Sequence, residues 1–265
     1  LGYASYADYA LANTMARTHD AVMHLLDDVW SRAVPALERE RGELMAQMTE
    51  QGVTHTIEPW DWRYWAEQVR QRRYAIDDAE VKPYFPLERM VAAAFDCAER
   101  LFGVRFVNRQ GLKLYHPDVN AYEVRGPGDK LVGVFLHDNF ARPSKRSGAW
   151  MSHYRQQTKN GGAVTPIVVN NNNFAKSAPG QPTLLSFDDV RTLFHEFGHG
   201  LHGLLSDVGY ERLSGTNVLR DFVEAPSQML EDWIYERNVL DLMREVCAAC
   251  PPIPDALLAQ AKAAK

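Results

Sequence analysis

One stretch of this 265-residue chain decides its fold: Ser186-Phe187-Asp188-Asp189-Val190-Arg191-Thr192-Leu193-Phe194-His195-Glu196-Phe197-Gly198-His199. Apolar residues recur at positions 190, 193, 194, 197, 201, 204 and 205, a spacing that places them on one face of a helix. Ser186 can cap the N-terminus of that helix, and the aspartates at 188 and 189 favour its first turn. The pattern predicts a helix over about residues 187 to 206.

Two histidines of this helix, His195 and His199, are four residues apart. The spacing places both imidazoles on one helical face, one turn apart, where neutral imidazole can bind Zn²⁺. Glu196 follows the first histidine and can hold the water that zinc polarises, remove its proton and later deliver a proton to a leaving amine. The motif therefore predicts a catalytic zinc centre with Glu196 as its general base.

The pattern His-Glu-x-x-His is short, so its chance frequency matters. With 9 histidines in the chain, random order gives the pattern in roughly one chain in fifty. The alternative explanation is a pair of hydrogen-bonded histidines on an amphipathic helix. Gly198 and Gly200 strengthen the zinc interpretation because each costs about 1 kcal/mol in a helix interior relative to alanine. Two glycines at this place predict that another element packs closely against the helix.

A catalytic zinc needs a third protein ligand and an open fourth position. One source would be a third histidine at position 205, in a pattern that also requires glycine at position 202. This pattern fails, because position 202 is His and position 205 is Leu. We expect His202 to pack or hydrogen-bond beside the site, since three ligands within two turns of one helix splay apart.

The other source is a carboxylate from the segment Asp221-Phe222-Val223-Glu224-Ala225-Pro226-Ser227-Gln228-Met229-Leu230-Glu231. Proline is acceptable in a first helical turn, which predicts a helix that starts near residues 222 to 225. Glu224 is the best candidate for the third ligand. Glu231 or Asp221 could orient a ligand histidine, although solvated surface charge explains these two residues equally well.

In the rest of the chain, the residue pattern changes near residue 103 from helical spacing to β-favouring runs. Helical spacing predicts helices over residues 5 to 50, 62 to 73 and 86 to 102. Beyond them, β-type residues predict a strand at 104 to 107, a hairpin of 119 to 124 with 130 to 136, and a buried strand at 165 to 170. We expect a mainly α chain with a small β-sheet, of the α+β class. Residues 1–103 form a helical region, and residues 104–265 form a mixed sheet with the helices of the site.

Bulk properties exclude several classes of partner. A formal net charge of -5 and a pI near 6.0 make nucleic acid or an anionic membrane an unfavourable partner. The chain has no apolar run long enough to span a bilayer and no signal-peptide pattern, so a cytoplasmic location is expected. Three cysteines, Cys97, Cys247 and Cys250, do not form a disulfide framework. We interpret the last two as thiols at a helix end.

The motif residues resemble the M3 family of zinc oligopeptidases, with its peptidyl-dipeptidase branch closest. The similarity rests on Phe194–His199 and Asp221–Gln228 with the interval between them, and it extends over nearly the whole chain. Further matching segments are Pro59–Trp62, Lys82–Phe85, Tyr115–Val119, Gly148–Met151 and Leu213–Asn217. The resemblance implies a mostly helical, two-lobed peptidase of zincin type, with a deep channel for short peptides. It also implies that His195, His199 and Glu224 bind one Zn²⁺ and that Glu196 is the general base.

Two departures from the family leave the activity of this chain open. Gly200 stands where alanine is usual, and family members are well over twice as long. The chain therefore reads as the N-terminal part of a catalytic domain, without the later glycine- and tyrosine-rich motif that binds substrate. We expect a zinc peptidase acting on short peptides, or else a truncated fragment that folds and binds zinc with little turnover. A helical binding module with an accidental motif is a third explanation, and surface exposed by truncation would favour self-association.

Overall fold

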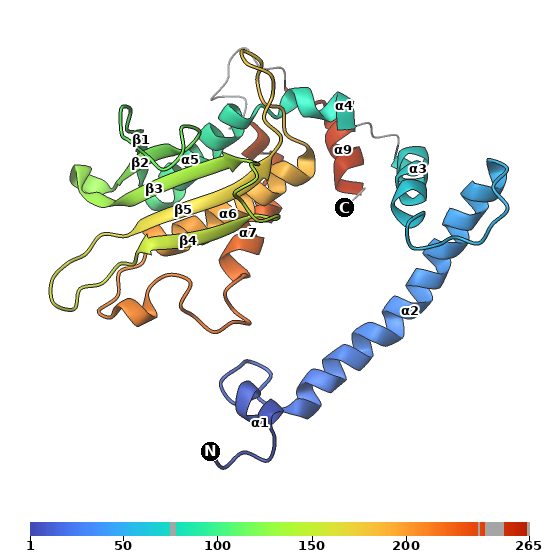
Figure 1. Ribbon diagram of the computed structural model, residues 1–265, viewed down its shortest axis with the longest axis horizontal. Helices are drawn as coiled ribbons and strands as arrows, with labels where there is room; N and C mark the ends of the chain where they lie inside the picture. Colours follow the sequence, from blue (N-terminus) through green and yellow to red (C-terminus); the bar gives the residue numbers. More distant parts are fainter. Residues whose placement is uncertain (75–77, 238, 242–251, 264–265) are drawn as a thin grey trace. The chain divides into compact units, whose positions relative to one another are not determined.

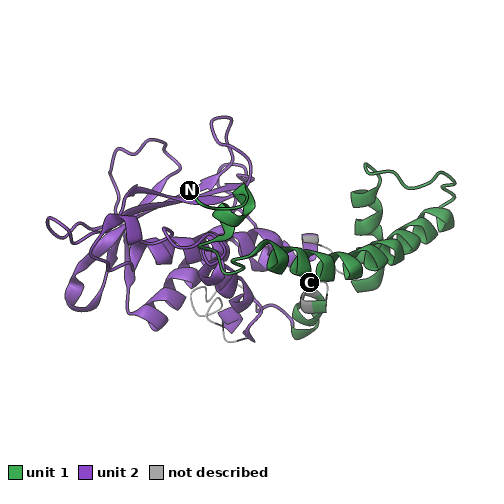
Figure 2. Ribbon diagram, turned by 90° about the horizontal axis from the view of Figure 1, so that it is seen from below, with its two compact units in different colours: residues 1–77, 255–265 green, residues 78–254 purple. Residues whose placement is uncertain are grey.

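The structure is a computed structural model that describes residues 1–74, 78–237, 239–241 and 252–263. The chain divides into two compact units, residues 1–77 with 255–265 and residues 78–254 (Figure 2). Residue 103, where the residue pattern changes, falls inside the second unit. The domain division expected there stays a prediction. The interpretation of Cys247 and Cys250 lies outside the described residues.

The described residues of the first unit form four helices. They are α1 (Tyr6–Leu11), α2 (His19–Glu50), α3 (Trp62–Tyr74) and α9 (Asp255–Ala263). The continuous helix predicted from residue 5 is interrupted before α2, where Thr18 caps the new helix by accepting a hydrogen bond from the backbone N–H of Ala21. The small core of this unit consists of Leu44, Met48, Ile57 and Trp65. The apolar side chains in the first half of α2, such as Trp30, are exposed.

The second unit is built on a five-stranded mixed sheet in the order β1-β2-β3-β5-β4 (Figure 1). The strands are β1 (Arg105–Asn108), β2 (Asn120–Arg125), β3 (Leu131–Phe140), β4 (Trp150–Arg155) and β5 (Ile167–Phe174). Strands β2 and β3 form the predicted antiparallel hairpin, through a turn that contains the short 3-10 helix η2 (Pro127–Asp129). Strands β3 and β5 are parallel, and β4 runs antiparallel to β5 at the edge of the sheet.

Helices cover one face of this sheet. The unit contains α4 (Asp78–Val81), η1 (Lys82–Tyr84), α5 (Leu87–Phe102), α6 (Phe187–Leu204), η3 (Glu211–Leu213) and α7 (Ala225–Trp233). Helix α5 ends where predicted, at Gly103, whose φ of 66° suits a glycine cap. Helix α6 contacts β3, β4 and β5 and packs against α7, behind the sheet in Figure 1. The sheet therefore supports α6 from one side while α7 holds it from another.

An aromatic cluster fixes α6 on the sheet. The ring of Phe197, inside the histidine motif, lies 5.5 to 5.9 Å from the rings of Phe95, Phe106 and Phe135. These rings come from α5, β1 and β3, and Phe135 and Phe197 are almost fully buried. Burying such side chains contributes about 1.5–3 kcal/mol each. The motif helix is therefore anchored by the hydrophobic core directly beneath its polar face.

The opposite face of the sheet carries a smaller apolar cluster. Val119, Ala121, Leu136 and Val169 are buried there, with Leu114 packed against them. The observed mixture of helices with one mixed sheet confirms the expected α+β class. In the part of the chain that the structure describes, no helix is both long and apolar enough to cross a membrane.

Candidate metal centre

Helix α6 begins with the cap that its sequence predicts. The Ser186 hydroxyl accepts a hydrogen bond from the Asp189 N–H at 3.1 Å. The Asp189 carboxylate accepts from the Ser186 N–H at 2.9 Å. This reciprocal capping box satisfies two backbone donors that the helix leaves free. The observed helix, Phe187–Leu204, confirms the prediction to within two residues.

Two glycines of α6 face different neighbours at close range. A Cβ on Gly198 would lie 2.7 Å from the Cα of Ser227 in α7, where backbone cannot yield. A Cβ on Gly200 would lie 3.1 Å from the Asn170 side chain of β5. The prediction that another element packs closely against the helix is confirmed, with α7 at one glycine and the sheet at the other.

The structure brings His195, His199 and Glu224 together. Their potential ligand atoms all lie within 4.8 Å of one another. The Oε2 atom of Glu224 is 3.2 Å from Nε2 of His195 and 3.0 Å from Nε2 of His199. All three predicted ligand atoms therefore converge on one point, with the carboxylate opposite the two imidazoles.

Helix α7 presents Glu224 from its N-cap position, in agreement with the predicted start of the helix. The Ser227 hydroxyl donates hydrogen bonds to the backbone oxygen of Glu224 at 2.9 Å and to its Oε2 at 3.0 Å. Burial acts to raise the pKa of Glu224, but the Ser227 bond and the two histidines outweigh it and lower the pKa. The carboxylate is thus held in its charged form.

Glu231 settles one alternative that the sequence leaves open. Its Oε1 lies 2.5 Å from Nδ1 of His195, one to two turns further along α7 than Glu224. The contact occupies the ring nitrogen that faces away from Glu224, so it fixes the orientation of the imidazole. Glu231 is therefore a partner of His195 rather than a solvated surface charge.

Glu196 is buried beside these residues and is 5% exposed. Its Oε2 atom has no hydrogen-bond partner among the described protein atoms. Burial raises the pKa of Glu196 to about 7, with His195 acting to lower it and Glu224 to raise it further. A carboxyl group with this pKa can both accept and return a proton near neutral pH.

A pocket of about 310 Å³ opens at these side chains. Its lining residues are Ala149, Trp150, Met151, His195, Glu196, His199, Thr216, Val223 and Glu224. Trp150 and Met151 begin β4, and Ala149 directly precedes it. This strand was not predicted from the sequence. The available signal was weak, because Trp150 and Tyr154 are the only β-favouring residue types in the run Trp150-Met151-Ser152-His153-Tyr154.

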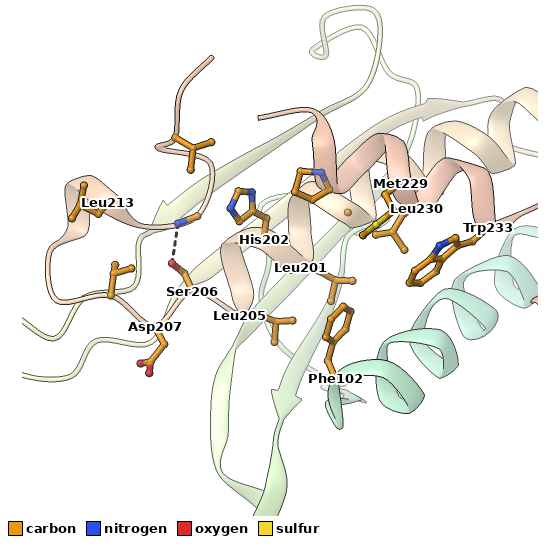
Figure 3. A pocket seen from close by; sticks show the side chains of 15 residues that line it. Phe102, Leu201, His202, Leu205, Ser206, Asp207, Leu213, Met229, Leu230 and Trp233 are labelled. Atoms are coloured by element: carbon orange, nitrogen blue, oxygen red, sulfur yellow. Dashed lines mark hydrogen bonds between the residues drawn. The ribbon is translucent and has the colours of Figure 1, made fainter. Parts of the chain in front are cut away.

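His202 lies one turn beyond His199 and lines a different hollow (Figure 3). Among the described residues, the group that could hold a metal ion does not include it. This second hollow, which we call the apolar groove, has a volume of about 400 Å³ and is lined mainly by α6, α7 and the segment between them. Phe102, Leu213 and Met229 in its wall are 46%, 60% and 55% exposed.

Comparison with known proteins matches the whole chain to one family. A family model described as peptidase family M3 covers residues 1–265. Dipeptidyl carboxypeptidase of Salmonella typhimurium is 41% identical over 243 residues, which are 91% of this chain and 35% of that protein. Oligopeptidase A of Haemophilus influenzae is 36% identical over 269 residues, which are 100% of this chain and 39% of that protein. The chain thus spans little more than a third of the length of these relatives.

Proposed function

Because the chain belongs to peptidase family M3, we propose that it is a zinc-dependent metallopeptidase that hydrolyses short oligopeptides, as a peptidyl-dipeptidase or an oligopeptidase. The observation that carries the proposal is the convergence of His195, His199 and Glu224 beside the buried Glu196. The names of two relatives, dipeptidyl carboxypeptidase and oligopeptidase A, support the substrate class.

The donor set fits one Zn²⁺ ion in both chemistry and spacing. Zinc binds histidine nitrogen and carboxylate oxygen at about 2.0–2.2 Å in tetrahedral sites, which separates neighbouring ligand atoms by roughly 3.3 Å. The separations of 3.2 and 3.0 Å between Glu224 Oε2 and the two imidazole nitrogens are close to this value. Two histidines and one glutamate also match the ligand type of zinc peptidases that keep one position open.

Glu196 supplies the proton chemistry in this proposal. When bound by the three ligands, zinc supplies a Lewis acid that polarises a peptide carbonyl and lowers the pKa of water to about 7. Glu196 accepts the proton of the attacking water and passes it to the leaving amine. Its burial and its raised pKa suit both halves of that task.

Strand β4 offers the surface on which a peptide would lie. It is an edge strand, paired with β5 on one side only, and its first residues line the pocket. An extended peptide can add to such an edge through main-chain hydrogen bonds, which bind many sequences alike. Ala149, Met151 and Val223 make the pocket wall partly apolar, so we expect a preference for apolar side chains next to the cleaved bond.

A chain that binds zinc with little or no turnover is the alternative. It is favoured by the pocket wall, where Thr216 and Trp150 are the only described lining residues with neutral side-chain donors apart from the two histidines of the site. A lost donor to the tetrahedral oxyanion lowers the rate by about 10²- to 10³-fold. Self-association through the apolar groove is a related proposal, because exposed apolar surface favours contact with another chain.

Cleavage of short chromogenic peptides separates these two functions. We expect turnover that a chelator abolishes and added Zn²⁺ restores, and that Glu196→Gln reduces to background while the variant still takes up zinc. Glu236 is an exposed glutamate shortly after α7. Glu236→Gln is therefore the matched control and should leave turnover unchanged. Zinc uptake without any turnover would contradict the peptidase proposal and support the alternative, a chain that binds zinc but does not cleave peptides.

A further inference from the structure

A buried ionic cluster lies outside the metal centre, at the end of β3. Asp138 is 0% exposed, and its carboxylate accepts hydrogen bonds from four donor atoms on three side chains. Two Arg142 nitrogens donate at 2.7 Å each, the Tyr115 hydroxyl at 3.0 Å and the Lys145 ammonium at 3.1 Å. A buried carboxylate is costly unless it is paired and hydrogen-bonded, and this one is fully satisfied.

Lys145 connects this cluster to the backbone of two strands. Its side chain is 3% exposed, which is rare for lysine. Besides the Asp138 carboxylate, its ammonium donates to the backbone oxygens of Asp138 at 3.0 Å, Phe140 at 2.9 Å and Asn172. These oxygens belong to β3 and β5, so one side chain fastens the loop after β3 to two central strands.

The same loop leads directly into the wall of the metal pocket. The Asn173 side chain, in β5, donates to the backbone oxygens of Arg146 at 2.7 Å and Gly148 at 2.6 Å. Ala149, Trp150 and Met151 follow at once and line the pocket. The backbone from Lys145 to Gly148 is therefore held at both ends, immediately before the edge strand begins.

We propose that Lys145 is a positioning residue for peptide binding, which acts by holding the start of β4 as the wall against which a peptide lies at the metal centre. The proposal rests on the proposed function, because it assigns β4 to the peptide. Lys145 itself contacts none of the three ligand residues in the contacts described. Its ammonium is suited to this role because its three N–H donors lie within hydrogen-bond distance of three carbonyl oxygens and one carboxylate and are shared among them, which an apolar side chain of the same length cannot do.

The placement of the metal ligands gives the proposal its distinguishing consequence. His195 and His199 lie on α6, and Glu224 lies at the start of α7, so the ligand set contains no residue of the loop or of β4. Release of the loop should weaken peptide binding while zinc affinity and the chemical step remain. A purely structural role would instead reduce peptide binding, zinc affinity and kcat together.

The test compares Lys145→Met with Lys176→Met. Lys176 also pairs with an aspartate, Asp118, but its side chain is 54% exposed, which makes it a matched control.

The dissociation constant of a labelled pentapeptide is measured on the zinc-loaded full chain in a Glu196→Gln background, so that the peptide stays intact. Zinc affinity is measured on the same proteins. For Lys145→Met we expect peptide affinity to fall about tenfold or more, which corresponds to about 1.4 kcal/mol of binding free energy. Zinc affinity should stay the same, and Lys176→Met should match the parent. With Glu196 present, the same change should raise KM and leave kcat nearly constant.

A second variant keeps the test decisive if Lys145→Met fails to fold. Asp138→Asn with Lys145→Met removes the two almost completely buried charges of the cluster and leaves Arg142, whose side chain is 18% exposed. Proteins often tolerate the loss of a buried pair better than the loss of one partner, and this variant still releases the three carbonyl oxygens. Unchanged peptide affinity in a folded variant would overturn the proposal, as would a parallel loss of zinc affinity. If the unsubstituted chain takes up no zinc, the proposed function itself fails, and this inference fails with it.

Discussion

At the scale of single residues, the second ring nitrogen of His195 decides how well the first can bind metal. Glu231 holds Nδ1 at 2.5 Å and also lies 3.5 Å from Arg191, so the carboxylate is itself held in place. We predict that Glu231→Gln lowers zinc affinity by about 10- to 100-fold, because partners of this kind orient a ligand and raise its basicity. Competition with a chromophoric chelator measures the effect. An affinity equal to that of the parent would remove Glu231 from the site.

A second residue, His137, makes the stability of the fold depend on pH. His137 is 4% exposed on β3, and burial lowers its pKa to about 4, with Asp138 acting to raise it and Lys145 to lower it. The unfolded chain binds this proton near its ordinary pKa of about 6.5, so the folded state is favoured above that pH and loses stability as the pH falls toward 4. The difference is worth about 3 kcal/mol.

Urea unfolding of His137→Gln at several pH values checks this prediction. The free energy of unfolding of the parent should fall more steeply than that of the variant between about pH 6.5 and 4, by up to about 3 kcal/mol. Parallel curves for the two proteins would show that His137 takes up its proton while folded.

At the scale of elements, the crossing of α6 and α7 sets the position of Glu224. A Cβ at Gly198 would meet the Ser227 backbone at 2.7 Å and Leu230 at 2.9 Å, so α7 must move to accept it. We predict that Gly198→Ala destabilises the fold by about 1–3 kcal/mol and weakens zinc binding, because α7 carries Glu224 with it. Thermal unfolding and zinc titration measure the two effects.

Gly42→Ala provides the control for that prediction. Gly42 also lies inside a helix, α2, but a Cβ there would meet nothing within 4 Å. This substitution should stabilise its helix by up to about 1 kcal/mol and leave zinc binding unchanged. Equal effects of the two substitutions would mean that the close contact at Gly198 has no influence.

Elements with a strong local signal could be predicted from the sequence. The cap at Ser186, the apolar spacing of α6 and the glycine after α5 each depend on neighbouring residues, and all three were confirmed. Strand β4 could not be recognised in the same way, because its residues are short of a regular apolar alternation and it pairs on one side only. The parallel pairing of β3 with β5 joins residues that are distant in sequence, and no local pattern specifies it.

The candidate site was predictable to a similar extent. His195, Glu196 and His199 follow from one helical motif, and Glu224 follows from the helix after it. Lys145 was not predictable, because its role depends on three carbonyl oxygens that the fold brings together. In sequence it is one cation of an ordinary basic loop.

At the scale of the whole molecule, the apolar groove next to the site presents exposed apolar side chains. Its wall includes Leu213 and Met229, both more than half exposed. If copies of the chain associate through it, Met229→Glu should shift sedimentation toward the monomer, because burying an unpaired carboxylate in such a contact is costly. Sedimentation velocity at several concentrations measures this. Association that is the same in both proteins would place the contact elsewhere.

The central claim is that His195, His199 and Glu224 form one zinc site, and the zinc content of the purified chain tests it most directly. Element-specific mass spectrometry after dialysis against buffered Zn²⁺ should find about one equivalent per chain, as expected for a three-ligand protein site. Substitution of both His199→Ala and Glu224→Ala should reduce that content to background, while Glu236→Gln should retain it. A parent chain without zinc, or a double variant that holds as much zinc as the parent, would contradict the account.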